Sequence, residues 1–192
     1  MIDQSLFYLV NKVCRNYVFD ALMPLVTELG RLNYLLVVAV ALLFFRKKEI
    51  RIVGLLLLIG LLASSSVVFY LKTWVARPRP YLALSGVHLL KQESGFSFPS
   101  GHATFIFFTV STVVAYFKRF YYLYIVAFLV AFSRVYIGVH YPFDIIAAAA
   151  IGTLLGYTMV WISKGGEYPF LRSQKSRLFS KIWWNQIRKK WN

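Results

Sequence analysis

The stretch SRVYIGVHYPFD, residues 133–144, places reactive side chains inside one of the most apolar parts of the chain. Between residues 120 and 163 the only formally charged side chains are Arg134 and Asp144, with His140 between them. A charge at the centre of a bilayer costs about 2.5–3.5 kcal/mol even on lenient insertion scales. Asp144 could fold back to one ring nitrogen of His140, fix the imidazole tautomer and make the other nitrogen a better nucleophile.

A second group of polar residues lies in KTWVARPRP, residues 72–80. Lys72 ends an apolar run, where a lysine alone usually extends its amine toward water. Arg79 follows seven residues later between two prolines, which stop the helix and stiffen the chain into an extended connection. Guanidinium groups on rigid backbone suit two-pronged binding of phosphate oxygens, so Arg77 and Arg79 indicate anion recognition.

A third group lies in FPSGHATF, residues 98–105. Ser100 is a candidate N-cap, Gly101 would let a ligand approach the backbone, and His102 would lie in the first helical turn. The N-terminus of a helix has free N–H groups and the positive end of the helix dipole, which favour anions. Taken alone, the segment could equally be a plain helix cap with a surface histidine, and a histidine near an aspartate is more often structural.

The three groups are predicted to lie on one face of the membrane. Polar residues placed by chance would be scattered over both faces. Cations around a helix N-terminus and two histidines describe a phosphate site with a nucleophile and a proton donor. His102, His140 and Asp144 could ligate a metal ion, but the neighbouring cations would repel it, so we expect no metal and no cofactor. The residues expected at this site are Lys72, Arg79, Ser100, Gly101, His102, Arg134, His140 and Asp144.

The elements that carry these residues are predicted to be transmembrane helices. Of the 192 residues, 59% are hydrophobic, and residues 52–71 form an uncharged run long enough for a helix to cross about 30 Å of hydrocarbon. We expect an all-α, polytopic transmembrane helical bundle with five spans, at Leu32–Phe45, Ile52–Leu71, Ala103–Phe117, Phe120–Ile137 and Ile145–Ile162. The first of these is short and must recruit residues upstream of Arg31.

The first 30 residues are less regular. Leu6, Leu9, Val10 and Val13 share one helical face, which is typical of an amphipathic helix at the membrane interface. A sixth span through residues 21–29 is the alternative. The segment lacks the pattern of a cleaved secretory signal.

The net charge of +15 is gathered in three basic clusters, at residues 46–51, at residues 118–119 and in the tail from Lys164. All three fall on one face of a five-span topology, which the positive-inside tendency makes cytoplasmic and which leaves the polar groups facing outward. The tail combines cations with tryptophans and is expected on anionic lipid headgroups rather than on nucleic acid. We therefore predict a membrane domain over residues 1–163 and a cytoplasmic tail over 164–192.

The three polar groups resemble the motifs of the type 2 phosphatidic acid phosphatase (PAP2) superfamily, which includes lipid phosphate phosphatases and vanadium haloperoxidases. The family pattern is Lys, six residues, Arg-Pro; then Pro-Ser-Gly-His; then Ser-Arg, five residues, His, three residues, Asp. In this sequence the pattern is complete, and its members are Lys72, Arg79, Pro80, Pro99, Ser100, Gly101, His102, Ser133, Arg134, His140 and Asp144. The resemblance covers residues 72–144 by motif and most of the chain by span arrangement.

The resemblance implies a two-step, metal-independent hydrolysis. His140 would attack phosphorus to form a phosphohistidine with Asp144 orienting it, and His102 would protonate the leaving oxygen and then activate water. The phosphoryl oxygens would be held by Lys72, Arg79, Ser100, the Gly101 amide and Arg134. Family members that act on lipids typically have six transmembrane helices in the core, which raises the expected number here from five to six.

Several alternatives stay open at this point. A soluble vanadate-dependent haloperoxidase is disfavoured by the apolar spans, and a catalytically silent lipid-binding or transport protein is the rival from another class. An outward-facing site fits recycling of a polyprenyl diphosphate carrier, so undecaprenyl diphosphate is the preferred substrate, with phosphatidylglycerophosphate, phosphatidate and lipid A as alternatives. Residues 81–98 are the one obvious variable contact region, in which His88 is expected to be a solvated loop residue. The small residues of 147–156 fit contact between copies or packing within one bundle equally well, so no oligomeric state is predicted.

Overall fold

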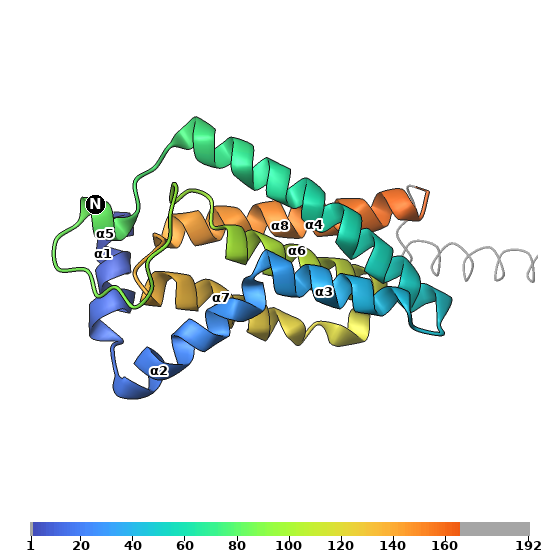
Figure 1. The fold of residues 1–192 in the computed structure, drawn as a ribbon, viewed down its shortest axis with the longest axis horizontal. Helices are drawn as coiled ribbons and strands as arrows, with labels where there is room; N and C mark the ends of the chain where they lie inside the picture. Colours follow the sequence, from blue (N-terminus) through green and yellow to red (C-terminus); the bar gives the residue numbers. More distant parts are fainter. Residues whose placement is uncertain (1, 166–192) are drawn as a thin grey trace, which may run out of the picture.

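Apolar helices account for the fold of the part of the chain that the computed structural model describes, residues 2–165. Within this range the structure contains helices and no strand, so the all-α prediction is confirmed. Five helices lie side by side along the long axis of the molecule (Figure 1), namely α3 (Leu32–Leu43), α4 (Lys48–Val75), α6 (Gly101–Tyr116), α7 (Leu123–Tyr136) and α8 (Pro142–Ser163). Almost all of the basic tail lies outside the described residues, and its place on lipid headgroups stays a prediction.

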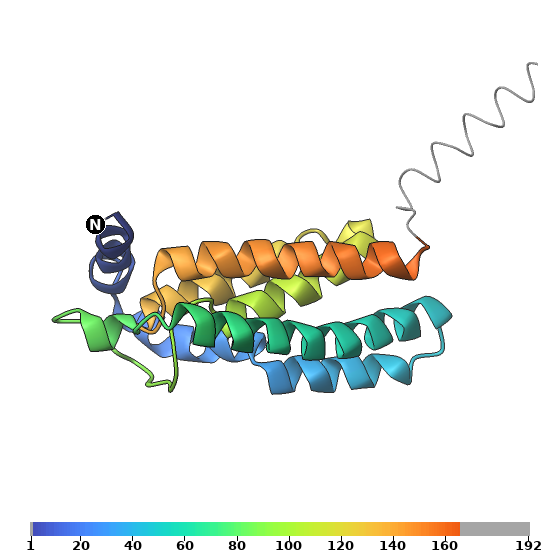
Figure 2. The same ribbon diagram turned by 90° about the horizontal axis from the view of Figure 1, so that it is seen from above.

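The N-terminal helix α1 (Ile2–Tyr8) and the π-helical turn η1 (Leu9–Val13) lie across one end of the bundle (Figures 1 and 2). Asp3, Phe7 and Asn11 are buried against the protein, whereas Leu6 and Leu9 on the predicted apolar face are exposed. This helix therefore docks through a face with two polar residues and turns apolar side chains outward, as an interfacial helix would.

The next segment shows why the first predicted span was short. The helix α2 (Tyr17–Val26) and the 3-10 turn η2 (Thr27–Gly30) continue into α3 across a bend of 51°, and together they are long and apolar enough to form one broken span. Residues 21–29 thus lie in a segment that, by length and composition, can join the first predicted span, and within residues 2–165 three helices, or four with this bent pair, meet the criteria for a span. Three further segments meet the same criteria, at Lys48–Ala83, Lys118–Tyr136 and Pro142–Ser163, and the shorter apolar helix α6 lies among them.

The bend between η2 and α3 is held by close contacts with α6 and α7. Arg31 has an extended backbone at the bend, with φ −73° and ψ 131°. A Cβ atom on Gly30 would lie only 2.7 Å from Cγ1 of Val130 and 2.9 Å from the carbonyl oxygen of His102, so this approach requires glycine. The bend consequently brings residues 27–31 against the start of α6, where one of the predicted site histidines lies.

The central helix of the bundle is α6, which is buried along almost its whole length. Two glycines of α8 allow the two helices to approach closely, because a Cβ atom on Gly152 would lie 2.4 Å from the carbonyl oxygen of Thr104 and one on Gly156 would lie 2.8 Å from that of Phe108. The Phe108 ring occupies the space beside Gly60 of α4. These two glycines of the 147–156 stretch therefore pack inside the bundle.

The outer surface of the bundle is apolar. Exposed hydrophobic side chains cover the faces of the long helices that point away from the core, including Leu55, Ile59 and Leu62 on α4, Ile125, Phe128 and Leu129 on α7, and Ile146 and Leu154 on α8. Such a continuous apolar surface is unfavourable in water and suits lipid, in agreement with a membrane location.

The two ends of the bundle differ in character. One end carries α1, the short helix α5 (Pro80–Ala83) and the long loop of residues 84–99 (Figure 1). The opposite end carries the connection between α3 and α4, the 3-10 turn η3 (Lys118–Phe120) and the end of α8. The predicted site residues lie at the first end and the basic clusters at residues 46–51 and 118–119 lie at the second, the separation that the sequence led us to expect.

Candidate active site

His140 and Asp144 face each other where α7 gives way to α8. Gly138 ends α7 with a φ of +89°, a conformation that favours glycine. Pro142 begins α8, and Asp144 accepts a hydrogen bond of 2.9 Å from the Tyr141 N–H, which holds its side chain in the first turn. Oδ2 of Asp144 lies 3.6 Å from Nδ1 of His140, and both side chains are almost completely buried.

Asp144 has two further partners that the motif does not contain. The hydroxyl group of Ser97 donates to Oδ2 of Asp144 and lies 3.4 Å from Nδ1 of His140. Nη1 of Arg77 donates to Oδ1 of Asp144 at 2.7 Å. Sequence reasoning named Arg77 only as a guanidinium beside Arg79 and did not name Ser97. The Asp144 carboxylate therefore has partners in the connection between α7 and α8, in the long loop and in the connection after α4.

Arg77 also joins the N-terminal helix to this arrangement. Its Nη2 donates to Oδ2 of Asp3 at 2.6 Å, and its guanidinium lies over the ring of Tyr141, 3.8 Å from the ring centroid. Asp3 additionally accepts a hydrogen bond of 3.0 Å from the N–H of Phe143, in the first turn of α8. Asp3 and Arg77, which lie 74 positions apart in the sequence, thus belong to one hydrogen-bond network with Asp144. No local sequence signal could predict this contact.

Arg79 is nearly fully buried and ties the long loop to the nucleophile. It donates to the carbonyl oxygens of Ser94 and Gly95 at 2.8 and 2.9 Å, and to that of Val139 at 3.1 Å. Its Nη1 lies 3.4 Å from Nε2 of His140, the ring nitrogen turned away from Asp144. The guanidinium therefore lies at the nitrogen that would act as a nucleophile.

Arg134 is completely buried near the end of α7, and Glu93 of the long loop neutralises it. Nη2 of Arg134 lies 2.5 Å from Oε2 of Glu93, and that oxygen also lies 3.5 Å from Nη1 of Arg79. Nη1 of Arg134 donates to Oγ1 of Thr27 at 2.7 Å, while its buried Nε has no hydrogen-bond partner within residues 2–165. A loop carboxylate that sequence reasoning treated as a variable contact thus lies between two predicted phosphate ligands.

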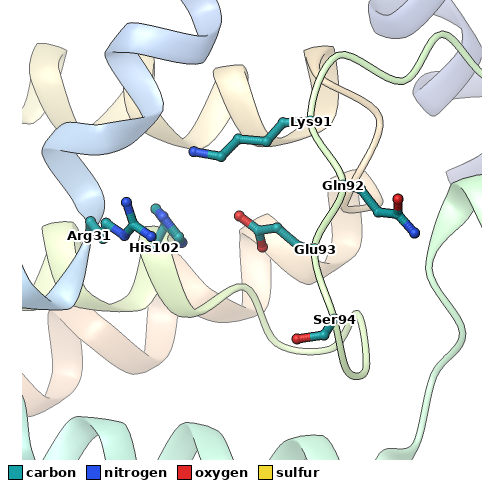
Figure 3. Close-up of a pocket in the computed structure, with 6 residues that line it drawn as sticks. All are labelled: Arg31, Lys91, Gln92, Glu93, Ser94 and His102. Carbon is teal, nitrogen blue, oxygen red and sulfur yellow. The ribbon is translucent and has the colours of Figure 1, made fainter.

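The segment Ser100–His102 begins α6, as predicted. Ser100 is buried and caps the helix, since its Oγ accepts a hydrogen bond of 3.4 Å from the Ala103 N–H. A Cβ atom on Gly101 would meet its nearest neighbour, the Phe105 ring, at 3.4 Å, so packing alone leaves room there. His102 lines a cavity of about 340 Å³ (Figure 3), whose other walls are Arg31, Lys91, Gln92, Glu93 and Ser94.

Lys72, in the last turn of α4, is the remaining predicted phosphate ligand. Its Nζ donates to the carbonyl oxygen of Phe96, in the long loop. The cation therefore reaches across to the same loop that carries Glu93 and Ser97, and it shares with Arg79 the role of holding this loop against the helix ends.

Charge in the site favours a neutral imidazole and a bound anion. Burial lowers the pKa of His140 to about 3 despite its hydrogen bond with Asp144, and the guanidinium groups of Arg134 and Arg79 add to the effect. Burial alone would raise the pKa of Glu93, but the ion pair with Arg134 and the neighbouring histidines lower it to about 2. At neutral pH the site therefore holds an unprotonated histidine beside cations that bind a carboxylate.

This arrangement can bind an anion and attack it. A neutral histidine with one nitrogen turned to a carboxylate has the form of an activated nucleophile. The Arg79 guanidinium beside the other nitrogen, together with Arg134 across Glu93, can stabilise developing negative charge. Within the described part of the chain, no three side chains of the types that ligate metals are grouped as an ion site.

Comparison with known proteins identifies the family. The model of the PAP2 superfamily matches residues 53–166, more than half of the chain. The chain belongs to the PAP2 superfamily. The resemblance that the motifs predicted is thereby confirmed, and with it the assignment of the chain as a lipid phosphatase of the PAP2 type.

The relatives of this PAP2 protein include enzymes with different lipid substrates. It is 30% identical over 150 residues to the undecaprenyl-diphosphatase of Sulfolobus acidocaldarius, a match that covers 77% of this chain and 72% of that protein. It is also similar to the transmembrane PAP2-type phosphatidylglycerolphosphate phosphatase of Bacillus subtilis, with a TM-score of 0.71, 28% identity and coverage of 85% and 87% of the two chains. LpxE of Aquifex aeolicus gives a TM-score of 0.73 at 29% identity, with 83% of this chain and 95% of that chain covered.

Proposed function

We propose that this chain hydrolyses a lipid phosphate or diphosphate at the outward-facing surface of its membrane. The reaction would pass through a phosphohistidine on His140, with undecaprenyl diphosphate as the preferred substrate. One observation carries the proposal. The same Nη1 atom of Arg79 lies 3.4 Å from Nε2 of His140 and 3.5 Å from the Glu93 carboxylate, which Arg134 binds at 2.5 Å. An anionic oxygen is thus held by the same guanidinium group that contacts the nucleophilic nitrogen, which supports binding of a phosphoryl group there.

In the first step, Nε2 of His140 forms a bond to phosphorus while the bond from phosphorus to the leaving oxygen breaks. Asp144 keeps the proton on Nδ1 and stabilises the positive charge that develops on the ring. The phosphoryl oxygens displace the Glu93 carboxylate from Arg134 and Arg79. Nε of Arg134, which has no hydrogen-bond partner among the described residues, offers them a further donor.

His102 is proposed to donate the proton that the leaving oxygen requires. Burial lowers the pKa of this imidazole to about 3 in the ligand-free site, and an anionic substrate beside it raises that pKa toward the protonated form. In the second step, His102 takes a proton from water, the water oxygen bonds to phosphorus, and the bond from phosphorus to Nε2 of His140 breaks. Inorganic phosphate leaves and both histidines return to their starting state. Lys72, Ser100 and the Gly101 N–H contribute positive charge and hydrogen-bond donors around the transferred group.

Placement of the site at a membrane surface is supported by the aromatic residues next to it. Tyr70 and Trp74 lie within two residues of Lys72 on α4 and are strongly exposed, and such side chains favour the interface between lipid and water. The basic residues at the opposite end of the bundle favour the cytoplasm, which would direct the site outward and the C-terminus inward.

The deciding experiment measures inorganic phosphate released by the detergent-purified protein, with a chelator present. The substrates are undecaprenyl diphosphate, phosphatidylglycerophosphate, phosphatidate and lipid A. His140→Ala should abolish release, while His88→Ala, which removes a loop histidine bound to Asp20, should retain it. Substrate labelled with ³²P at the transferred phosphorus should leave an acid-labile, base-stable label on the wild-type protein only.

The outcomes separate the alternatives. Full activity of His140→Ala would exclude the phosphohistidine mechanism, and activity lost with chelator would exclude a metal-independent site. Saturable lipid binding without phosphate release would favour the silent lipid-binding protein. The highest kcat/KM among the four lipids identifies the substrate class.

Sidedness needs a separate measurement. Single cysteines placed at Gln92 and at Lys47, in a Cys14→Ser background, should react differently with an impermeant maleimide in intact cells, with Gln92→Cys labelled from outside and Lys47→Cys protected. The reverse pattern would overturn the proposed orientation.

A further inference from the structure

We propose that the cavity beside His102 binds the second phosphate of a lipid diphosphate through Arg31 and Lys91, so that these two cations make the enzyme selective for diphosphates. The inference rests on the proposed function and adds residues that lie outside the family motifs. The cavity, at about 340 Å³, falls within the range of about 300–1,000 Å³ that is usual for ligand sites. Its walls come from the bend before α3, the start of α6 and the long loop.

The position of the cavity relative to the reaction follows from two residues that it shares with the active site. Glu93 lines the cavity, and its carboxylate binds Arg134 and Arg79, which marks the position of the transferred phosphoryl group. His102 lines the cavity as well and donates to the leaving oxygen. The atom bonded to that oxygen on its far side must therefore lie in the cavity. Figure 3 shows Glu93, His102, Arg31 and Lys91 directed toward this shared space.

The identity of that next atom is what distinguishes the substrate classes. In a lipid monophosphate it is a carbon atom, which gains nothing from cations. In a lipid diphosphate it is a second phosphorus, whose oxygens carry negative charge and which leaves as the lipid monophosphate. Arg31 and Lys91 place a guanidinium and an ammonium group at this point, and such groups bind phosphate oxygens through charge-assisted hydrogen bonds.

The two cations of the cavity also have more N–H donors than their present carboxylate partner can accept. Glu28 pairs with both cations, at 2.9 Å from Nη1 of Arg31 and in a short contact with Nζ of Lys91. One carboxylate cannot use the eight N–H donors of these two side chains together. A phosphoryl group that displaces the carboxylate of Glu93 from Arg134 and Arg79 brings its own negative charge, so the cations that remain for a second phosphate are Arg31 and Lys91.

In the reaction this site would act on the leaving group. The bond from Nε2 of His140 to the terminal phosphorus forms as the bond from that phosphorus to the bridging oxygen breaks. The bridging oxygen keeps the electron pair, takes the proton from His102 and departs as part of the lipid monophosphate. Arg31 and Lys91 would bind this phosphate before and during its departure.

The test compares two substrates that differ only in the second phosphate, farnesyl diphosphate and farnesyl monophosphate, with the full-length protein in detergent. In Arg31→Gln and in Lys91→Gln, the ratio of KM for the diphosphate to KM for the monophosphate should rise about tenfold, the value of one charge-assisted hydrogen bond at a partly exposed site. Arg15→Gln removes an exposed cation outside the cavity and should leave the ratio at the wild-type value.

The outcomes distinguish failure of the diphosphate site from failure of the proposed function. An unchanged ratio of the two KM values in both variants would overturn the inference. It would mean that Arg31 and Lys91 only form ion pairs with Glu28. Wild-type hydrolysis of the monophosphate without the diphosphate would overturn it as well, while leaving a lipid phosphatase. No hydrolysis of either farnesyl compound or of any lipid substrate would overturn the proposed function together with the inference. Thermal unfolding of each variant, compared with Arg15→Gln, separates misfolding from lost binding.

Discussion

Replacement of Glu93 by glutamine should weaken the fold and strengthen anion binding at the same time. The wild-type carboxylate lies 2.5 Å from Nη2 of Arg134 and 3.5 Å from Nη1 of Arg79. Arg134 is fully buried, and removal of one partner from a buried ion pair costs about 3–5 kcal/mol. The glutamine carbonyl can still accept one hydrogen bond from Arg134, so we expect a loss of about 3 kcal/mol in the free energy of unfolding.

The same substitution removes a competitor for the phosphate site. A phosphoryl group must first displace the carboxylate, and a charge-assisted hydrogen bond contributes about 1.5–3 kcal/mol, so its removal should tighten binding of a phosphate analogue about ten- to a hundredfold. Orthovanadate is a suitable analogue, because it can form a bond to the histidine nitrogen at the site. Bound anion should also restore thermal stability in Glu93→Gln more than in wild type, since ligand that binds only the folded state stabilises it.

The assay is inhibition of phosphate release by orthovanadate, combined with thermal unfolding at increasing orthovanadate concentrations. Glu49→Gln serves as the control, because it removes an exposed carboxylate at the opposite end of the bundle. Weaker or unchanged inhibition of Glu93→Gln would refute the reasoning, since it would mean that Glu93 does not occupy the phosphate position. An unchanged unfolding temperature would show that Arg134 does not depend on this carboxylate.

Arg77→Gln should lower kcat about ten- to a hundredfold with a smaller effect on KM, because Asp144 loses a charged donor, and Arg77→Lys should recover part of the loss in steady-state assays. Gly152→Val should destabilise the protein by about 1–3 kcal/mol, measured by thermal unfolding, because its Cβ would lie 2.4 Å from a carbonyl oxygen of α6. Acid should destabilise the wild type. The pKa values of His140, about 3, and Glu93, about 2, lie below their ordinary values, so stability falls between about pH 6.5 and 2, and Glu93→Gln should flatten the lower part of this curve.

The family, the all-helical membrane fold and the end of the bundle that carries the polar groups could be predicted from the sequence because their signals are local. A motif with fixed spacing, such as the one that joins His140 to Asp144, states which residues share a helix turn. Long uncharged apolar runs indicate which segments can cross a lipid bilayer. The short first span was likewise recognisable as incomplete, since too few apolar residues precede Arg46 to cross a bilayer.

Partners that meet only in the folded protein were decided by tertiary structure. Asp3 reaches Arg77 and Glu93 reaches Arg134 across long sequence separations, and neither pair has a spacing that a pattern could register. The packing of α6 against the bend at Gly30 decides where His102 and its cavity lie. The sequence alone therefore predicted which groups could bind and attack a phosphate, because reactivity belongs to residue types and local spacing. Only the three-dimensional arrangement decided which charges hold those groups in place, because a buried charge must find its partner wherever the packed chain brings one within reach.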